Sequence, residues 1–389
     1  MPASVRLGTE VLLSSMRLKG ARVGVVCNHA SIDSGFQHVI DRVNACEGVT
    51  LAAIFGPQHG FRSDVQDNMV ETPHRDDPRR RIPIYSLYSE TREPTAEMLR
   101  GIDVLVIDLQ DIGARIYTYI YTMANCMKAA ATHGVTVMVC DRPNPIGGTA
   151  VEGASLRPGW ESFVGQFPIP MRHGMTIGEL AHLFNDAFSI DAALEVVKME
   201  GWTRAMYADD TGLPWVMPSP NMPTLDTAIV YPGTVLFEGT MLSEGRGTTR
   251  PFELVGAPWI DAERFAEAMN ESGLDGVHFR PAGFEPTFQK HAKQPCGGCQ
   301  IHVLDREAFK PVVTGVALIA TFRRCDTTRF AWRQPPYEYE HDKMPIDILA
   351  GSDALRTQIE AGTPIRDIAA SWANDEAAFR RLRAPYLLY

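Results

Sequence analysis

The clearest indication of the architecture lies in residues 103–145, which read DVLVIDLQDIGARIYTYIYTMANCMKAAATHGVTVMVCDRPNP. The continuous apolar runs Val104–Asp108 and Val135–Cys140 are typical of strands that are buried on both faces. Between them, Tyr117–His133 has helical spacing, and Gly134 stands where a helix commonly ends in the left-handed conformation. This order of strand, helix and strand predicts a unit of a parallel sheet.

The same pattern repeats toward the N-terminus. Three more apolar runs predict further strands, Val23–Cys27, Leu51–Phe55 and Ile82–Leu87. The stretch Glu93–Arg100 has helical spacing, and Pro94 is tolerated in a first helical turn. Alternating strands and helices predict an α/β fold with a Rossmann-like, doubly wound parallel sheet.

The residue pattern of the chain changes near residue 228. Before this point, Thr176–Phe188 is expected to be a helix with Thr176 as its N-cap and Glu179 completing a capping box. The elements expected on either side of the change are a strand at Val196–Met199, a helix at Asp261–Ser272, a strand at Cys299–Leu304 and a helix at Ala308–Thr321. We therefore predict a Rossmann-like domain over residues 1–228 and a smaller α+β domain over residues 229–389.

Composition limits the possible partners and location. The 389 residues carry 47 acidic and 37 basic side chains, and the formal net charge of -10 argues against non-specific binding to nucleic acid or to an anionic membrane. No apolar run approaches the roughly 18–20 residues that span a bilayer. Seven scattered cysteines and the lack of a signal-peptide pattern favour the cytoplasm, or the periplasm or exterior if an export signal has been removed. The oligomeric state is left open.

Several familiar motifs are missing. Neither G-x-G-x-x-G after the first strand nor G-x-x-x-x-G-K-[ST] occurs, which argues against a bound dinucleotide or nucleoside triphosphate. No G-x-S-x-G motif indicates an α/β-hydrolase. His291, Cys296, Cys299 and His302 have spacing reminiscent of zinc ligands, but residues 299 and 302 of a strand point to opposite faces. We therefore expect no metal and no cofactor.

Polar side chains follow every predicted strand of the sheet. In open parallel sheets, ligands bind beyond these carboxyl ends. The residues at this edge are Asn28, His29, Gln58, His59, Tyr85, Ser86, Asp108, Gln110, Asp111, Asp141, Arg142 and Asn144. A Gly-rich segment at 237–253, FEGTMLSEGRGTTRPFE, adds Glu238, Glu244 and Arg246, and its glycines allow close approach of the backbone to a ligand. Together these features predict a polar cleft that suits a sugar.

Several long strings resemble the NamZ family of exo-β-N-acetylmuramidases, in order from about residue 22 to the final YLLY. They include GPQHGFRSDVQD, PIYSLYSETREPTAEML, DRPNPIGG, PIPMRHGMTIGELA, FEGTMLSEGRGTTRPFELVGAPW and PPYEYEHDKMPIDILAG. The resemblance implies a Rossmann-like domain, a smaller C-terminal domain and an active site in the cleft between them. It also implies release of terminal β-linked N-acetylmuramic acid from peptidoglycan fragments, with a small sugar or muropeptide as substrate.

One position departs from the family pattern. The family string P-E-H-G-F-R-G has a glutamate regarded as catalytic, and this chain has Gln58 there. Glutamine cannot transfer a proton as a glycosidase acid must. Either another carboxylate supplies the acid or the activity differs.

Glycoside hydrolysis normally uses one protonated carboxyl and one ionised carboxylate. Among Asp108, Asp111, Glu152 and Glu244, we favour Glu244 and Glu152 as catalytic, followed by Asp108. The residues expected to bind substrate are Gln58, His59, Arg62, Asn28, Asp111, Arg142, Asn144, Arg246 and Tyr119. Among these, an arginine would pair with the lactyl carboxylate of muramic acid. A substrate-assisted route through the 2-acetamido group is an open alternative.

Two other functions fit the same residues. The first is a non-hydrolytic muropeptide- or sugar-binding protein with a degenerate site, which Gln58 favours. The second is a hexosaminidase of altered specificity. A redox enzyme is disfavoured because the dinucleotide fingerprint is missing.

Overall fold

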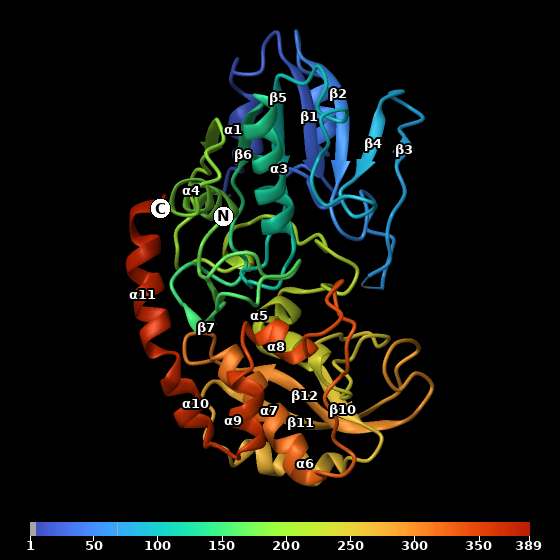
Figure 1. Ribbon diagram of the computed structural model, residues 1–389, viewed down its shortest axis with the longest axis vertical. Coiled ribbons are helices and arrows are strands. Elements are labelled where there is room, and N and C mark those ends of the chain that lie inside the picture. Colours follow the sequence, from blue (N-terminus) through green and yellow to red (C-terminus); the bar gives the residue numbers. More distant parts are fainter. Residues whose placement is uncertain (1–4, 68) are drawn as a thin grey trace.

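A seven-stranded sheet forms the centre of the first part of the chain (Figure 1). The computed structural model describes residues 5–67 and 69–389. The strand order is β3-β4-β2-β1-β5-β6-β9, and every neighbouring pair is parallel except β3 with β4. The strands are β1 (Arg22–Cys27), β2 (Thr50–Gly56), β3 (Arg75–Asp76), β4 (Pro83–Ser86), β5 (Val104–Asp108), β6 (Thr136–Cys140) and β9 (Leu194–Val197).

Helices cover both faces of this sheet. Val25 packs in one apolar cluster with residues of α1 (Gly8–Leu13) and α2 (Val39–Asn44). Its neighbour Val26 packs in another cluster, with residues of α3 (Tyr119–His133) and α4 (Ile177–Ala187). Successive strand residues point to opposite faces, so both faces of the sheet are buried. The predicted Rossmann-like, doubly wound α/β fold is confirmed.

Local sequence patterns predicted two helices correctly and a third one incorrectly. Helix α3 ends at Gly134, whose φ of 68° is left-handed, and Thr176 and Glu179 form the expected capping box of α4. The predicted helix at 93–100 is wrong. Only a short turn forms there, with Leu99 N–H donating to Thr95 C=O, and the chain leaves it at Gly101.

The second part of the chain is built on a three-stranded antiparallel sheet in the order β10-β12-β11. The strands are β10 (Leu254–Ala257), β11 (Val277–Phe284) and β12 (Cys296–Val303); the helices are α5 (Leu225–Thr234), α6 (Ala262–Asn270), α7 (Pro311–Cys325), α8 (Pro345–Ala350), α9 (Ala354–Glu360) and α10 (Ile365–Ser371). Short 3-10 helices in the described residues are η1 (Ala208–Asp210), before this part, and η2 (Val235–Gly239) and η3 (Ala384–Tyr386). The domain boundary proposed at residue 228 falls inside α5 and stays a prediction.

The end of the chain returns to the first part. Helix α11 (Ala373–Arg383) runs along the side of the molecule and brings the C-terminus back toward α4 (Figure 1). Arg383 Nη1 donates to the carbonyls of Gly148, His173 and Gly174. No helix among residues 5–67 and 69–389 is long and apolar enough to cross a membrane.

A buried arginine joins the two parts. The Arg115 guanidinium donates to the carbonyl oxygens of Ala154 and Ile169, which belong to or border the small β7 (Glu152–Ser155) and β8 (Pro170–Arg172) sheet. It also donates to the carbonyl of Leu349 in α8, at 2.7 Å. Burial lowers the pKa of Arg115 to about 10. The side chain therefore remains charged at neutral pH, and its Nη1 and Nη2 atoms donate to main-chain oxygens.

We expect Arg115→Met to lower the free energy of unfolding by about 3 kcal/mol or more, because three carbonyls lose their donor and each buried unsatisfied group costs roughly 1–3 kcal/mol. Urea denaturation of both proteins would measure this. The control is Arg366→Met, since the Arg366 side chain is 87% exposed. Equal stability of the two variants would show that Arg115 does not join the parts.

Candidate active site

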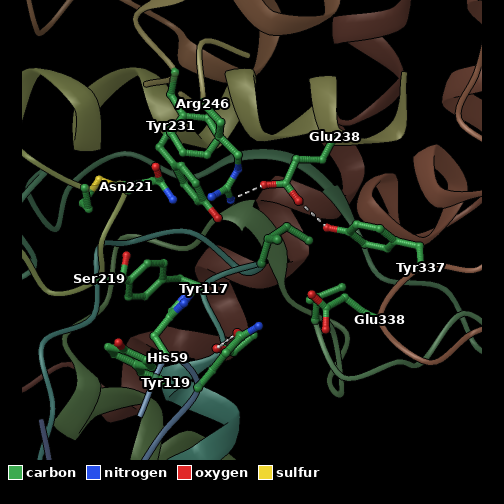
Figure 2. Close-up of a pocket in the computed structure, with 16 residues that line it drawn as sticks. His59, Tyr117, Tyr119, Ser219, Asn221, Tyr231, Glu238, Arg246, Tyr337 and Glu338 are labelled. Atoms are coloured by element: carbon green, nitrogen blue, oxygen red, sulfur yellow. Dashed lines mark hydrogen bonds and ion pairs between the residues drawn. The ribbon is translucent and has the colours of Figure 1, made fainter. Parts of the chain in front are cut away.

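A pocket lies where the carboxyl end of the sheet meets the second part of the chain (Figure 2). Three groups of residues line it. From the first part come Gln58, His59, Ile116, Tyr117, Thr118, Tyr119 and Val164; from the connecting segment come Ser219, Asn221 and Met222; from the second part come Tyr231, Glu238, Arg246, Phe252, Tyr337 and Glu338. The pocket therefore has carboxylates on one side and several aromatic rings around it.

Glu238 lies in η2 and is fixed through both of its carboxylate oxygens. Arg246 Nη2 donates to Oε1 at 2.6 Å, and the Tyr337 hydroxyl donates to Oε2 at 2.7 Å (Figure 2). Burial alone would raise the pKa of Glu238. The charge of Arg246 and the hydrogen bonds from Arg246 and Tyr337 outweigh burial and lower that pKa below its ordinary value. Glu238 is therefore ionised at neutral pH.

Glu338 provides a second carboxyl of opposite character. Its donors are neutral, namely the Tyr88 hydroxyl at 3.1 Å from Oε2 and the side chain of Gln58. Burial and the nearby charge of Glu238 raise the pKa of Glu338 to about 7. Its backbone φ of 45° is unusual for a residue other than glycine, and such conformations cluster at functional sites. Glu338 can therefore hold a proton near neutral pH.

Gln58 follows β2 and is oriented by both ends of its amide. Its Oε1 accepts a hydrogen bond of 2.8 Å from the Thr118 hydroxyl. The side-chain hydrogen bond between Gln58 and Glu338 then uses the amide NH₂, which can only donate. Gln58 thus holds Glu338 in place without itself transferring a proton.

His59 is a neutral member of the pocket. Its Nδ1 lies 2.7 Å from the Val65 carbonyl, so Nδ1 carries the hydrogen and Nε2 is an acceptor. Burial lowers the pKa of His59 to about 4. Its φ of 70° is left-handed, a second strained backbone position at this site. His59 can accept a hydrogen bond from a ligand hydroxyl but does not bring a positive charge.

Aromatic rings form a continuous wall. The ring centroids of Tyr117 and Tyr119 are 4.9 Å apart, those of Tyr117 and Tyr231 are 6.1 Å apart, and those of Tyr231 and Phe252 are 4.8 Å apart. Tyr119 is held by its hydroxyl, which donates to Pro218 C=O and accepts from Asn28 Nδ2. Such a wall offers apolar contact to the face of a sugar ring.

Of the predicted site residues, the structure places Gln58, His59, Tyr119 and Arg246 in this pocket, with Asn28 supporting Tyr119. The predicted catalytic carboxylates lie elsewhere. Glu152 accepts the Val313 N–H at 2.9 Å in the first turn of α7, and burial raises its pKa to about 7. Glu244 lies behind Arg246, at 2.5 Å from Lys290 Nζ.

Other predicted residues have structural partners or lie outside the pocket. Asp108 and Arg142 form a buried ion pair of 2.5 Å. Asp111 accepts the Gly113 N–H, and Asn144 bonds with Met175 and Ile146 in a turn. Arg62 is exposed in a neighbouring hollow. Their functional roles stay predictions, as do those of Glu152 and Glu244.

Two pocket carboxylates were not among the predicted site residues. Glu238 was noted in the Gly-rich segment, and Glu338 lies within the string PPYEYEHDKMPID. Neither follows a strand of the parallel sheet, so the strand-end rule could not find them. The clustering of aromatic and acidic residues at 337–340 was the available signal.

The whole chain matches known proteins. The family model "Exo-beta-N-acetylmuramidase NamZ, N-terminal" matches residues 23–226, and the model for the C-terminal part matches residues 229–389. The peptidoglycan β-N-acetylmuramidase NamZ of Bacillus subtilis (strain 168) is 46% identical over 388 residues, covering 99% of this chain and 91% of that protein.

Two solved structures are also similar. Both are crystal structures of DUF1343 family proteins from Bacteroides fragilis NCTC 9343. One is 35% identical with a TM-score of 0.89, covering 99% of each chain. The other is 29% identical with a TM-score of 0.76, covering 100% of this chain and 99% of that one.

The raised pKa of Glu338 predicts a pH-dependent cost to stability. Between its ordinary value of 4.5 and about 7, the folded protein keeps a proton that the unfolded chain has lost, so stability falls as pH rises. Glu338→Gln should remove about 3 kcal/mol of this fall. Urea denaturation at about pH 4 and pH 8 tests it, with the exposed Glu97→Gln as control. An unchanged pH dependence in Glu338→Gln would contradict the assignment.

Proposed function

We propose, since the chain belongs to the NamZ family of exo-β-N-acetylmuramidases, that it releases terminal β-linked N-acetylmuramic acid from peptidoglycan fragments. The observation that carries this proposal is the pair of buried pocket carboxyls with different partners: Glu238 is paired with the Arg246 guanidinium, whereas Glu338 accepts from the neutral Tyr88 hydroxyl. Glycosidases need this combination of an acid and a carboxylate. The similarity to the B. subtilis enzyme supports the substrate class.

In the proposed reaction, Glu338 protonates the glycosidic oxygen as the bond to the anomeric carbon breaks. Both oxygens of Glu238 already accept hydrogen bonds from Arg246 and Tyr337, which makes them poor nucleophiles. We therefore assign Glu238 to stabilising the positive charge that develops on the sugar, while the substrate's acetamido oxygen attacks the anomeric carbon. Water then opens the cyclic intermediate and returns a proton to Glu338.

Gln58 and His59 have binding roles in this scheme. Gln58 keeps the Glu338 carboxyl oriented, and His59 Nε2 accepts a hydrogen bond from a sugar hydroxyl. The tyrosine wall contacts the apolar face of the ring. Glu152, Glu244 and Asp108 remain rival candidates for the catalytic carboxylates, and variants at these positions separate the two sets.

Turnover of a chromogenic β-N-acetylmuramide tests the catalytic assignment. We expect Glu338→Gln and Glu238→Gln each to lower kcat by about 10²–10⁴-fold, the usual contribution of an acid or a charge-stabilising group. The matched control is Glu152→Gln, which is equally buried but caps α7, and it should keep kcat within about threefold. Loss of turnover only in Glu152→Gln would reverse the assignment.

The pH dependence of kcat gives a separate test. Glu338 acts in its protonated form, so kcat should fall as pH rises through about 7, or through a somewhat higher pH if the charge of the bound substrate raises the pKa of Glu338 further. Glu238 acts ionised, and its lowered pKa places the acid-side loss below about pH 4.5. A kcat profile that stays level from about pH 6 to pH 9 would exclude Glu338 as the acid.

A second candidate function is muropeptide binding without hydrolysis, favoured by glutamine at position 58. Calorimetric binding of a muropeptide with no product over hours would select it. Turnover of a β-N-acetylglucosaminide in preference to the muramide would instead indicate a hexosaminidase of altered specificity.

A further inference from the structure

Behind the pocket wall, four charged side chains form a continuous chain, of which Lys290 is partly buried and the other three are buried. Arg246 lies between two carboxylates, with Nη2 at 2.6 Å from Glu238 and Nε at 3.4 Å from Glu244. Lys290 Nζ lies 2.5 Å from the far oxygen of Glu244. Neither Glu244 nor Lys290 lines the pocket. The order Glu238, Arg246, Glu244, Lys290 alternates in sign and sums to zero charge.

Lys290 also holds the turn that carries Glu238. Its Nζ donates to the carbonyl of Phe237 at 2.8 Å and to the carbonyl of Thr240 at 3.1 Å. These two residues flank Glu238 and Gly239 in the sequence. The ammonium thus donates to two carbonyls on either side of the functional residue and forms an ion pair with Glu244. Lys290 therefore fixes η2 by geometry as well as by charge.

We propose that Lys290 and Glu244 are positioning residues that set the place and ionisation of Glu238 through Arg246. The inference rests on the proposed function only in taking Glu238 as a catalytic residue. With Lys290 present, the charge of Glu244 is balanced and Arg246 can serve Glu238. Without Lys290, Glu244 competes with Glu238 for the Arg246 guanidinium, because burying an unpaired carboxylate costs free energy.

The charges around this chain all bear on the expected pH behaviour. Glu238 faces Arg246 and Tyr337 directly, with Tyr231, Glu338 and Lys290 nearby. Lys290 faces Glu244 and Glu238 and also senses Arg333. Glu244 and Lys290 belong to this chain of charges, but neither of them lines the pocket. Changes at these two positions therefore alter Glu238 without removing a substrate contact.

The two single variants should act in opposite directions. Lys290→Met frees Glu244 to draw Arg246 away from Glu238, so the acid-side loss of kcat should move up by about one pH unit and kcat should fall about tenfold or more. Glu244→Gln removes a negative charge that competes with Glu238 for Arg246, so this acid-side loss should move to lower pH. The double variant should lie between them, and KM should change little in all three.

The control is Lys293→Met, an exposed lysine of the same loop. It should leave kcat, KM and the pH profile unchanged. A purely structural role for Lys290 would lower the amount of folded enzyme without moving the profile. Shifts in the same direction for both single variants, or no shift, would overturn the proposal. If Lys290→Met does not fold, the proposal is tested by Glu244→Gln alone, in which the acid-side loss of kcat should move to lower pH.

A stability measurement keeps the test independent of turnover. Glu238 has a lowered pKa, so the stability that it contributes is present at higher pH and is lost as pH falls through that pKa. Glu238→Gln is introduced into the wild type and into Lys290→Met, and the loss of unfolding free energy that it causes is measured against pH. As pH falls, this loss should disappear at a higher pH in the Lys290→Met protein than in the wild type. Active Glu238→Gln enzyme would refute the catalytic assignment alone, whereas an unmoved stability difference would refute the positioning role alone.

Discussion

The guanidinium of Arg115 is the contact on which the pocket depends. Arg115 directly precedes Ile116–Tyr119 in the sequence, and these residues line one side of the pocket. On the other side, its guanidinium donates to the Leu349 carbonyl of α8. Helix α8 in turn packs against η2, where Gly239 has no room for a side chain because a Cβ would lie 2.6 Å from the Ile346 backbone. This buried cation, which pairs with no carboxylate among the described residues, thus fixes the aromatic wall relative to Glu238.

The environments of the two carboxyls separate their protonation states. Glu238 has a cation and a phenol as donors, whereas Glu338 has two neutral donors, Tyr88 and Gln58. A glutamate at position 58 would add a third carboxyl to this group and would compete with Glu338 for a single proton. The glutamine in this chain removes that competition. The departure from the family pattern is therefore compatible with an acid supplied by Glu338.

Local sequence signals predicted the sheet and the helix caps because each depends on a few neighbouring residues, as at Thr176 and Gly134. The strand-end rule likewise found Gln58 and His59. The same rule selected Asp108 and Arg142, which bind each other, since it cannot tell a ligand-facing side chain from a paired one. Glu338 was missed because its contact with Tyr88 spans 250 residues.

The substrate of the proposed function, N-acetylmuramic acid, carries a lactyl carboxylate, and this negative charge must be accommodated in the pocket. Among the described residues, Arg246 is the only lysine or arginine in the pocket lining, and Glu238 already binds it. A lactyl carboxylate entering the pocket would therefore meet mainly neutral groups and the Glu338 carboxyl. Its negative charge disfavours ionised Glu338 and so raises that pKa further. The negative charge of the lactyl group thus weakens binding, but it also keeps Glu338 protonated until the proton is transferred to the glycosidic oxygen.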